Sequence, residues 1–283
     1  MPRLYISDIH ILDGRISITG EKVRYLTSVL RCRKGDELII FDGKGSCLRT
    51  TILKADRKEV ITTVMEKFSC NTESPINITL VQGTLKGEKM DMVVQKVTEL
   101  GVMEIIPVVT ERSQLRETRK VARWKKIAEE ASRQSGRSVI PIIHEPVDFK
   151  KFLNTRILQI ASQGLIFYEE HGMKISEAVE IIKQSLEANA VPDFRTSNPP
   201  SSPFTKGGQR GITEKGGKGG FEENFGFTIF VVIGPEGGFT KEEVTLAKEK
   251  GLLVTFLGER ILRAETAAIS AVTLVQFLLG DMG

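Results

Sequence analysis

From residue 78 onward, short apolar segments alternate with amphipathic segments, and this alternation constrains the fold more than any other feature of the sequence. The segment 88–100, for example, repeats its apolar residues at helical spacing, whereas the run at 78–81 is almost wholly apolar. Parallel strands need a crossover of a dozen or more residues, usually a helix. The pattern therefore predicts an α/β domain with a mostly parallel sheet and helices on both faces. The predicted strands are 78–81, 103–109, 164–168, 228–233 and 253–256, and the predicted helices are 88–100, 119–134, 175–186, 241–250 and 264–279.

The first 70 residues follow a different pattern, because short strand-like runs are separated by glycine-containing turns. Strands are predicted at 37–41, 47–53 and 59–66, and one helix is predicted near 21–30. This is the pattern of a small, mostly β barrel. A single hydrophobic core stops growing at about 250–300 residues, so two domains are expected in a chain of 283 residues. We place them at 1–72 and 73–283.

Residues 190–226 interrupt the alternation, since they contain eight Gly and four Pro in 37 positions and few large apolar residues. Such a composition cannot bury enough apolar surface to offset its ordering entropy. We therefore expect a flexible surface insertion between a helix and a strand. A Gly-Lys loop that contacts nucleic acid is the alternative interpretation.

Composition excludes several classes of protein. With 40% hydrophobic and 27% charged residues, the chain has the balance of a globular protein. The longest apolar run is shorter than the ~20 residues that span a bilayer, and the first residues lack the apolar core of a signal peptide, so we expect a cytoplasmic protein. The three cysteines are too scattered for a disulfide framework, and the three histidines are too far apart for a metal pair. Free thiols and no metal are expected.

Positive charge is concentrated in the first quarter of the chain. Residues 1–72 hold 13 Lys or Arg against 9 Asp or Glu, whereas residues 73–283 hold 27 of each. A second local excess lies at 110–137. Two basic surfaces on two domains could bind one polyanion. The alternative is that the basic residues form an ordinary solvated helix face, and charge alone favours this alternative.

A glycine-rich loop, residues 234–240, follows the apolar strand at 228–233 and leads into a helix. Its three glycines allow positive φ angles and a close approach of the backbone to a ligand. Thr240 is predicted to cap the helix, with Glu243 completing a capping box. The loop lacks the spacing of the dinucleotide-binding and phosphate-binding glycine motifs, which excludes those interpretations. A tight strand-to-helix turn without a ligand is the alternative.

A second loop, residues 257–268, places arginines at the start of an almost wholly apolar helix. Such a helix must be buried on several sides, and a second subunit could supply half of that burial. The arginines need partners, which could be phosphates or carboxylates in an Arg263–Glu265 or Arg260–Glu259 pair. Because ligands bind at the carboxyl ends of parallel strands, we expect the two loops to converge from neighbouring strands into one cleft.

These two loops resemble the signature of the ribosomal RNA small subunit methyltransferase E family, within the SPOUT methyltransferases. The resemblance rests on 234–239 and 257–267, and it continues at 86–91, 94–102, 109–113, 124–137, 25–31 and 41–43. It covers nearly the whole chain except residues 190–226.

The resemblance implies a PUA-like RNA-binding barrel followed by a SPOUT-type α/β domain with a trefoil knot, assembled as a homodimer. It also implies an enzyme that uses S-adenosylmethionine to methylate N3 of a specific uridine in 16S ribosomal RNA of the small subunit. The donor pocket is then expected at Phe167, Ile233, Gly234, Pro235, Glu236, Gly237, Gly238, Leu257, Gly258, Ile261, Leu262, Arg263, Thr266 and Ala267.

Chemistry narrows the roles of these residues. Positioning of two reactants can contribute about 7–11 kcal/mol, whereas each pKa unit of nucleophile deprotonation costs about 1.4 kcal/mol, so a dedicated base is not required. We expect Arg263 to stabilise negative charge on the uracil carbonyls, with Glu236 or Glu265 orienting it. The alternative makes Glu236 the base.

RNA phosphates are expected to contact Arg3, Arg24, Arg31, Arg112, Arg133, Arg137 and Arg260. Phe41 and Tyr168 are candidates for stacking on a base, but core packing is favoured for both, as it is for Trp124. Two other functions are compatible with the sequence. The chain could be a SPOUT enzyme that acts on transfer RNA or on ribose, or a non-catalytic RNA-binding assembly factor.

Overall fold

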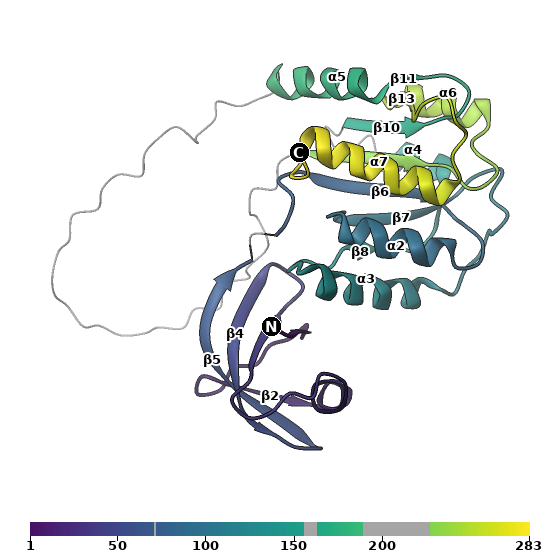
Figure 1. Ribbon diagram of the computed structural model, residues 1–283. Helices are drawn as coiled ribbons and strands as arrows, with labels where there is room; N and C mark the ends of the chain where they lie inside the picture. The colour runs from purple at the N-terminus through teal and green to yellow at the C-terminus, as the bar shows by residue number, and fades with distance from the viewer. Residues whose placement is uncertain (71, 156–162, 189–226) are drawn as a thin grey trace, which may run out of the picture.

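The computed structural model describes residues 1–70, 72–155, 163–188 and 227–283, and it forms two units, each built on one sheet (Figure 1). The segment 190–226, for which the sequence predicts an insertion, lies outside the described residues. The N-terminal sheet has the strand order β1-β3-β4-β5-β2. Its elements are β1 (Arg3–Tyr5), β2 (Arg15–Thr19), α1 (Glu21–Arg24), the π-helical turn η1 (Tyr25–Val29), β3 (Glu37–Phe41), β4 (Ser46–Ala55) and β5 (Glu59–Ser69).

The N-terminal sheet forms because its strands alternate apolar and polar residues. On β2, Ile16 and Ile18 are buried while their neighbours in the strand are exposed, so one face of the strand packs into a core. The helical segment α1–η1 covers that core with Val23 and Leu26. The predicted strands at 37–41, 47–53 and 59–66 are confirmed, whereas β1 and β2 are too short or too polar to stand out in the sequence.

Cys47 and Cys70 are joined by a disulfide, so the expectation of three free thiols is wrong. The antiparallel pairing of β4 with β5 sets Cys47 opposite Phe68, which brings Cys70 alongside with a Cα–Cα distance of 6.2 Å. This lies within the range that a disulfide spans. The proximity arises from strand register, which cysteine spacing does not reveal. Cys32 is free and buried.

The second sheet has eight strands, in the order β11-β13-β10-β12-β6-β7-β8, with β9 paired to β7. Every pair in it is parallel, which confirms the parallel sheet expected from the alternation. Its strands are β6 (Asn77–Gly83), β7 (Glu104–Val109), β8 (Ile142–Ile143), β9 (Val147–Asp148), β10 (Gln163–Phe167), β11 (Met173–Lys174), β12 (Thr228–Ile233) and β13 (Leu253–Phe256). Its helices are α2 (Lys89–Glu99), α3 (Val121–Ser135), α4 (Phe149–Thr155), α5 (Ile175–Ala188), α6 (Lys241–Glu249) and α7 (Ala264–Leu279).

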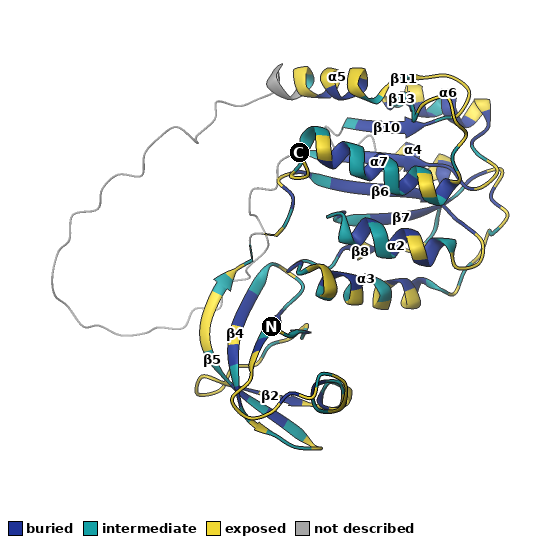
Figure 2. Cartoon of the chain, viewed as in Figure 1, coloured by how far each residue is buried: buried dark blue, intermediate teal, exposed yellow. Residues whose placement is uncertain are grey.

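Helices cover both faces of this sheet, as predicted. On β12, Val231 contributes to the core shared with α2, α3, α5 and α7, whereas Val232 contributes to the core shared with α4 and α6. The two residues point to opposite faces because side chains alternate along a strand. Figure 2 shows the strands buried and the outer helix faces exposed. No helix within the described ranges is long and apolar enough to cross a membrane.

Trp124 anchors α3 against α2, which confirms its predicted core role. Its side chain is fully buried, and its Nε1 donates to Asp91 Oδ1 at 3.0 Å. The same carboxylate accepts from Arg123 Nε at 2.8 Å. One acidic residue on α2 thus satisfies both the buried indole and a neighbouring guanidinium.

A buried ion pair between Arg137 and Glu73, which stands at the start of the second unit, lies at the junction of the two units. Arg137 is 2% exposed, and its Nε and Nη2 donate to Glu73 Oε2 at 2.9 and 2.7 Å. Its Nη1 donates to the carbonyl oxygens of Thr98 and Val102. The expected contact between Arg137 and RNA phosphate is therefore wrong, because this guanidinium is fully engaged inside the protein.

Two further arginines from the expected RNA set lie at the junction. Arg3 donates from Nη2 to the Arg137 carbonyl oxygen at 2.9 Å and lies 5.2 Å from the centre of the Phe41 ring. Arg133 lies 4.4 Å from the Tyr25 ring. Phe41 itself is fully buried, so it belongs to the core and is not a stacking platform. Both arginines pack the N-terminal domain against the second one.

We expect Arg137→Lys to fold but to lose about 1–3 kcal/mol of unfolding free energy. Lysine keeps the charge, but it cannot donate at once to the Glu73 carboxylate and to two carbonyl oxygens through a planar fork. Urea unfolding of the full chain measures the loss. Arg24→Lys, on an exposed arginine of α1, is the matched control and is expected to stay within about 0.5 kcal/mol of the parent. Equal stability of both variants contradicts the prediction.

Candidate functional site

The two sequence-predicted loops converge at the carboxyl ends of the parallel strands. They enclose a cavity of about 560 Å³. The loops follow β12 and β13, which are not adjacent, because β10 lies between them. The expectation of neighbouring strands is thus corrected, and the end of β10 supplies a third wall with Phe167, Tyr168 and Glu169.

The cavity wall contains most of the residues expected there. It includes Phe167, Ile233, Gly234, Pro235, Glu236, Gly237, Gly238, Leu257, Gly258, Ile261, Leu262, Arg263 and Ala267, together with Glu265 and Arg260. Thr266 is not part of the wall and is exposed on the first turn of α7. The role of the expected wall residues in cofactor binding stays a prediction. The wall also contains Lys89, Glu169 and Phe256, which the sequence did not single out.

The first loop is held by the end of β6. The buried Gln82 donates from Nε2 to the carbonyl oxygens of Gly83 and Gly234, at 3.1 and 3.2 Å. Gly238 closes the turn, since its amide donates to the Pro235 carbonyl oxygen at 2.9 Å. Its φ is 68°, and a Cβ there would lie 2.9 Å from Glu169 Oε1. Glycine is therefore favoured at this position for its backbone conformation, whereas the Glu169 carboxylate, at the end of an exposed side chain, could move away from a Cβ.

The capping box predicted at the start of α6 is confirmed, and it also holds a neighbouring segment. The Glu243 amide donates to Thr240 Oγ1, and the Thr240 amide donates to Glu243 Oε2. Glu243 Oε1 accepts in addition from the Glu111 amide at 2.8 Å. Next to it, Arg112 Nη1 donates to the Gly237 carbonyl oxygen at 3.2 Å. An exposed arginine of the expected RNA set therefore lies against the first loop.

Glu236 is tied to the start of α2. Its Oε1 accepts from Lys89 Nζ and from the Lys86 amide, both at 3.1 Å. Burial alone raises the pKa of Glu236, but the hydrogen bonds from its own amide, the Lys86 amide and Lys89 outweigh that effect and lower it. The carboxylate is thus ionised and engaged. It orients Lys89 rather than Arg263, a pairing that no sequence signal indicated.

The second loop presents its arginines without internal partners. Arg263 is the N-cap residue of α7 and, like Arg260, is exposed. Among the described residues, neither the Arg263–Glu265 nor the Arg260–Glu259 ion pair is formed. Glu265 Oε2 is buried and has no hydrogen-bond partner in the structure. A buried carboxylate oxygen without a donor is costly, so this atom is a candidate contact for a ligand.

Tyr168 stands beside these groups at the end of β10. Its side chain is partly buried in the cavity wall. Burial raises the pKa of the Tyr168 hydroxyl, and Glu170 and Glu169 raise it further. The phenol is therefore neutral at physiological pH, and it offers an aromatic face and a hydroxyl to a bound molecule.

Comparison with known proteins decides the family. The chain matches the family model of an RNA methyltransferase domain at residues 72–191 and 210–276, and that of an RNA methyltransferase PUA domain at residues 18–65. The chain belongs to this RNA methyltransferase family. A PUA-like N-terminal domain, expected from the resemblance, is thereby confirmed.

Relatives of this RNA methyltransferase carry the family name that the loops suggested. Ribosomal RNA small subunit methyltransferase E of Bacillus subtilis is 29% identical over 92% of this chain and 89% of its own length. The same enzyme of Synechocystis is 28% identical over 98% of this chain and 78% of its own length. The resemblance drawn from the two loops is thus confirmed.

Two solved structures resemble the RNA methyltransferase over their whole length. One is ribosomal RNA small subunit methyltransferase E from Neisseria gonorrhoeae bound to S-adenosyl methionine, with a TM-score of 0.76, 28% identity and full coverage of both chains. The other is a putative methyltransferase from Legionella pneumophila in complex with the same cofactor, with a TM-score of 0.74, 28% identity and coverage of 99% and 98%. These likenesses confirm the SPOUT-type α/β fold class.

Proposed function

We propose that this RNA methyltransferase uses S-adenosylmethionine to methylate N3 of a specific uridine in 16S ribosomal RNA of the small subunit. The observation that carries the proposal is the convergence of the two loops on one cavity, whose wall contains both Arg263, which has no partner among the described residues, and Glu265, whose Oε2 is buried. The names of the relatives and the cofactor in two similar structures support the substrate class and the methyl donor.

The residues of the cavity fit this donor. A volume of about 560 Å³ lies within the roughly 300–1,000 Å³ of small-molecule sites. Ile233, Leu257 and Leu262 offer apolar walls, while the glycines of the first loop expose main-chain groups to a ligand. The unpartnered Glu265 Oε2 would accept a hydrogen bond from an ammonium or hydroxyl group of the donor.

Bound at this site, S-adenosylmethionine supplies a methyl group on a sulfonium that leaves readily. The chain then has to align the uracil and manage the charge that develops when N3 loses its proton. Arg263 stabilises that charge at a uracil carbonyl oxygen, because its guanidinium has no partner to give up among the residues that the structure describes. The Lys89–Glu236 pair fixes the first loop on α2, so that the cavity keeps its shape.

A direct test incubates the purified chain, methyl-labelled donor and small ribosomal subunits or free 16S RNA, and maps the product by mass spectrometry. One uridine carrying a methyl group on N3 supports the proposal. Methylation of ribose or of transfer RNA would instead indicate another SPOUT activity. If calorimetry detects no donor binding, the chain is a non-catalytic assembly factor.

We expect Glu236→Gln to lower kcat by less than about tenfold. A general base contributes about 10²–10⁴-fold and works best with a pKa near the operating pH, whereas the pKa of Glu236 is held below its ordinary 4.5. Steady-state kinetics at saturating donor and RNA across pH measure the effect. A loss beyond about 10²-fold, together with loss of the acid limb of the pH profile, would make Glu236 the base.

The lowered pKa of Glu236 also predicts how the stability of the first loop depends on pH. A carboxyl group whose pKa is lowered in the folded state stabilises that state above its unfolded pKa, and the contribution disappears as the pH falls through the folded value. The contribution of Glu236 is thus complete at neutral pH and is lost only in acid, below 4.5. The protection factors of the first-loop amides are expected to fall there in the parent chain and not in Glu236→Gln.

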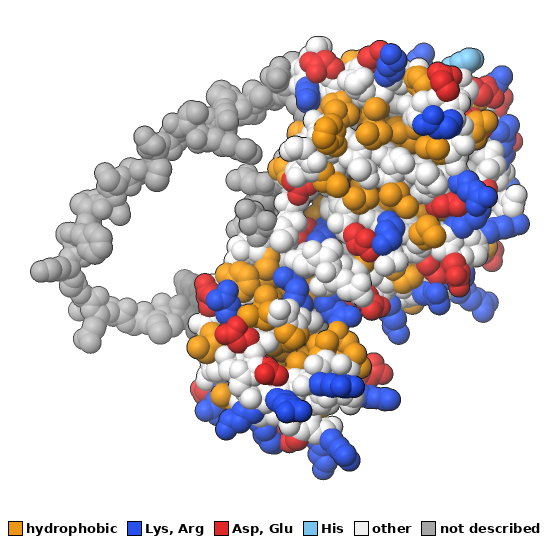
Figure 3. Space-filling view, viewed as in Figure 1, with side chains coloured by type: hydrophobic (Ala, Val, Ile, Leu, Met, Phe, Trp, Pro, Cys, Tyr) orange, Lys and Arg blue, Asp and Glu red, His pale blue; other side chains and the backbone are white. Residues whose placement is uncertain are grey.

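RNA binding is proposed to rest on exposed arginines of both domains. Arg24, Arg31, Arg112 and Arg260 are exposed, and Figure 3 shows Lys and Arg gathered at the outer end of the N-terminal domain and along the lower edge of the second one. We expect log affinity to fall linearly with log salt, and Arg31→Ala to reduce that slope by about 0.7–0.9. Filter binding over a salt series measures it. A salt-independent affinity would contradict phosphate contacts.

A homodimer and a cytoplasmic location are part of the same proposal. Apolar side chains remain exposed on one side of the second domain, among them Met92, Ile181 and Phe277, at 50%, 44% and 57%. Figure 3 shows rows of hydrophobic side chains on this face. Such surfaces mark interfaces, and light scattering on the purified chain measures the expected doubling of mass. The cytoplasmic location rests on the proposed 16S RNA substrate.

A further inference from the structure

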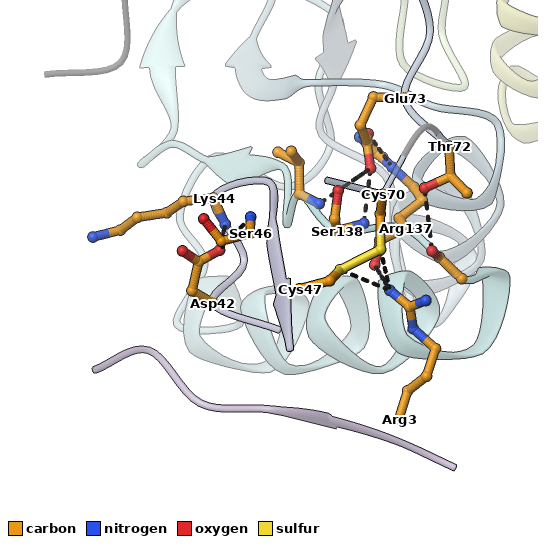
Figure 4. Close-up of a disulfide and its surroundings, with 12 residues drawn as sticks. Arg3, Asp42, Lys44, Ser46, Cys47, Cys70, Thr72, Glu73, Arg137 and Ser138 are labelled. Carbon is orange, nitrogen blue, oxygen red and sulfur yellow. Dashed lines mark hydrogen bonds and ion pairs between the residues drawn. A yellow bond between two sulfur atoms is a disulfide. The ribbon is translucent and has the colours of Figure 1, made fainter. Parts of the chain in front are cut away.

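The Cys47–Cys70 disulfide lies at the junction between the N-terminal domain and the second domain. Figure 4 shows it between Arg3 on one side and the Arg137–Glu73 pair on the other. Arg3 Nη2 lies 3.9 Å from each of the two sulfur atoms and also donates to the Arg137 carbonyl oxygen. The disulfide therefore joins β4 to the segment that leads into the second domain, at the point where that segment meets the end of α3.

The two half-cystines differ in exposure. Cys47 is completely buried, whereas Cys70 is only partly buried. An external thiolate is therefore expected to approach the disulfide from the side of Cys70. Thiol–disulfide exchange depends on which sulfur is accessible and on how well the other one leaves. This asymmetry favours a defined direction of attack.

Arg3 is suited to stabilise the departing sulfur. It is half-buried, and its Nε is buried without a hydrogen-bond partner. Burial lowers the pKa of Arg3, and the charge of Glu73 raises it. The charged residues that Figure 4 shows around the disulfide are Arg3, Asp42, Lys44, Glu73 and Arg137. Glu73 and Arg137 neutralise each other, whereas the Arg3 guanidinium lies 3.9 Å from each sulfur atom. A guanidinium with donors to spare would stabilise a thiolate formed beside it.

We propose that Cys47 and Cys70 form a thiol–disulfide exchange site whose substrate is a dithiol reductant. A thiolate of the dithiol attacks the Cys70 sulfur, forms a mixed disulfide with it and releases Cys47 as a thiolate beside Arg3. The second thiol of the reductant, once deprotonated, displaces Cys70. The dithiol ends as a disulfide, and the chain gains two electrons and two protons as two thiols. The oxidised dithiol reverses the sequence.

Reduction at this site acts on the domain junction. Thr72 donates from Oγ1 to the Gly136 carbonyl oxygen, and the Glu73 carboxylate accepts from the Ser138 and Val139 amides. The disulfide holds the chain leading into these contacts against β4. Without it, the junction loses its covalent restraint on the N-terminal side, and the Ser138 and Val139 amides should exchange hydrogen faster.

The test treats the full-length oxidised chain with dithiothreitol under native conditions. Samples are quenched by alkylation, and each cysteine is quantified by mass spectrometry. The buried free thiol of Cys32 is the internal control, because it becomes alkylated only when the N-terminal domain unfolds. Arg3→Met removes the cation near the sulfurs. Arg57→Met is the matched control, since this exposed arginine lies in the turn at the opposite end of the β4–β5 hairpin.

The proposal expects Cys47 and Cys70 to become alkylated while Cys32 stays protected, and the reduced chain to show faster exchange at Ser138 and Val139. Arg3→Met should slow the reduction by about three- to tenfold, and Arg57→Met should leave it unchanged. The proposal is overturned if Cys47 and Cys70 become alkylated only when Cys32 does, because the domain must then unfold before the disulfide is reduced. It is also overturned if an oxidant fails to restore the disulfide between the two thiols. Equal rates for both variants overturn the role of Arg3. If Arg3→Met does not fold, the parent chain decides the outcome together with Cys47→Ser, whose Cys70 thiolate should attack an added monothiol disulfide, keep one half of it as a mixed disulfide and release the other half as a thiol.

Discussion

Replacing Arg263 by alanine is expected to lower kcat by about 10²–10³-fold at saturating donor and RNA, the range found when a donor to a developing oxyanion is removed. Arg263 caps α7 in the cavity wall, and its guanidinium has no partner among the described residues. Its charge is therefore available to the uracil carbonyl oxygen. Single-turnover kinetics with labelled donor measure the chemical step without product release.

Arg263→Lys serves as the control for this prediction. Lysine keeps the charge but not the two-pronged geometry, so it is expected to restore part of the lost kcat. Donor affinity measured by calorimetry separates a binding defect from a catalytic one. Full kcat in Arg263→Ala would show that charge stabilisation at this position is not part of the mechanism.

Gly83→Ala is expected to lower the rate of methylation by about 10²-fold, the effect of a displacement of about 1 Å on a reaction rate, and to weaken donor binding. A Cβ at Gly83, the last residue of β6, would lie 2.6 Å from Pro235 Cδ and 2.7 Å from the carbonyl carbon of Gly234. Because these are main-chain and ring atoms, the first loop has to move as a unit. Isothermal calorimetry with S-adenosylmethionine measures the loss.

Gly87→Ala controls for general damage to this region. Gly87 also has a positive φ, of 65°, but nothing lies within 4 Å of the position of its Cβ. Its substitution is expected to cost about 1–2 kcal/mol of stability through backbone strain alone and to leave donor affinity unchanged. If Gly83→Ala folds and binds the donor like the parent chain, the first loop does not form the donor site.

Much of the second domain could be predicted from the sequence because its elements are strongly patterned. The strands 228–233 and 253–256 and the helix 264–279 have the predicted bounds, since each is a mostly apolar run. Gly234 follows the first strand, and Arg263 and Gly280 flank the helix. Short elements such as α4 (Phe149–Thr155) were missed, because seven residues give too few repeats for a helical period.

The candidate site was predicted less completely, because its contacts join distant parts of the chain. Lys89 and Glu236 meet across 147 residues, so neither could be assigned to the other from spacing. Arg137 was expected to contact RNA phosphates, which requires an exposed side chain. Its actual partner Glu73 is 64 residues away in the sequence, and only the fold brings the two together. The position of β10 between β12 and β13 in the sheet is likewise set by the topology and cannot be seen in a local sequence pattern.

If the loops after β12 and β13 together hold the methyl donor, its binding should protect both of them. Amide hydrogen exchange of the full chain, with and without saturating S-adenosylmethionine, measures this protection. Residues 234–239 and 257–263 are expected to become protected together at the same donor concentration. Protection of only one loop, or protection confined to other parts of the chain, would contradict it.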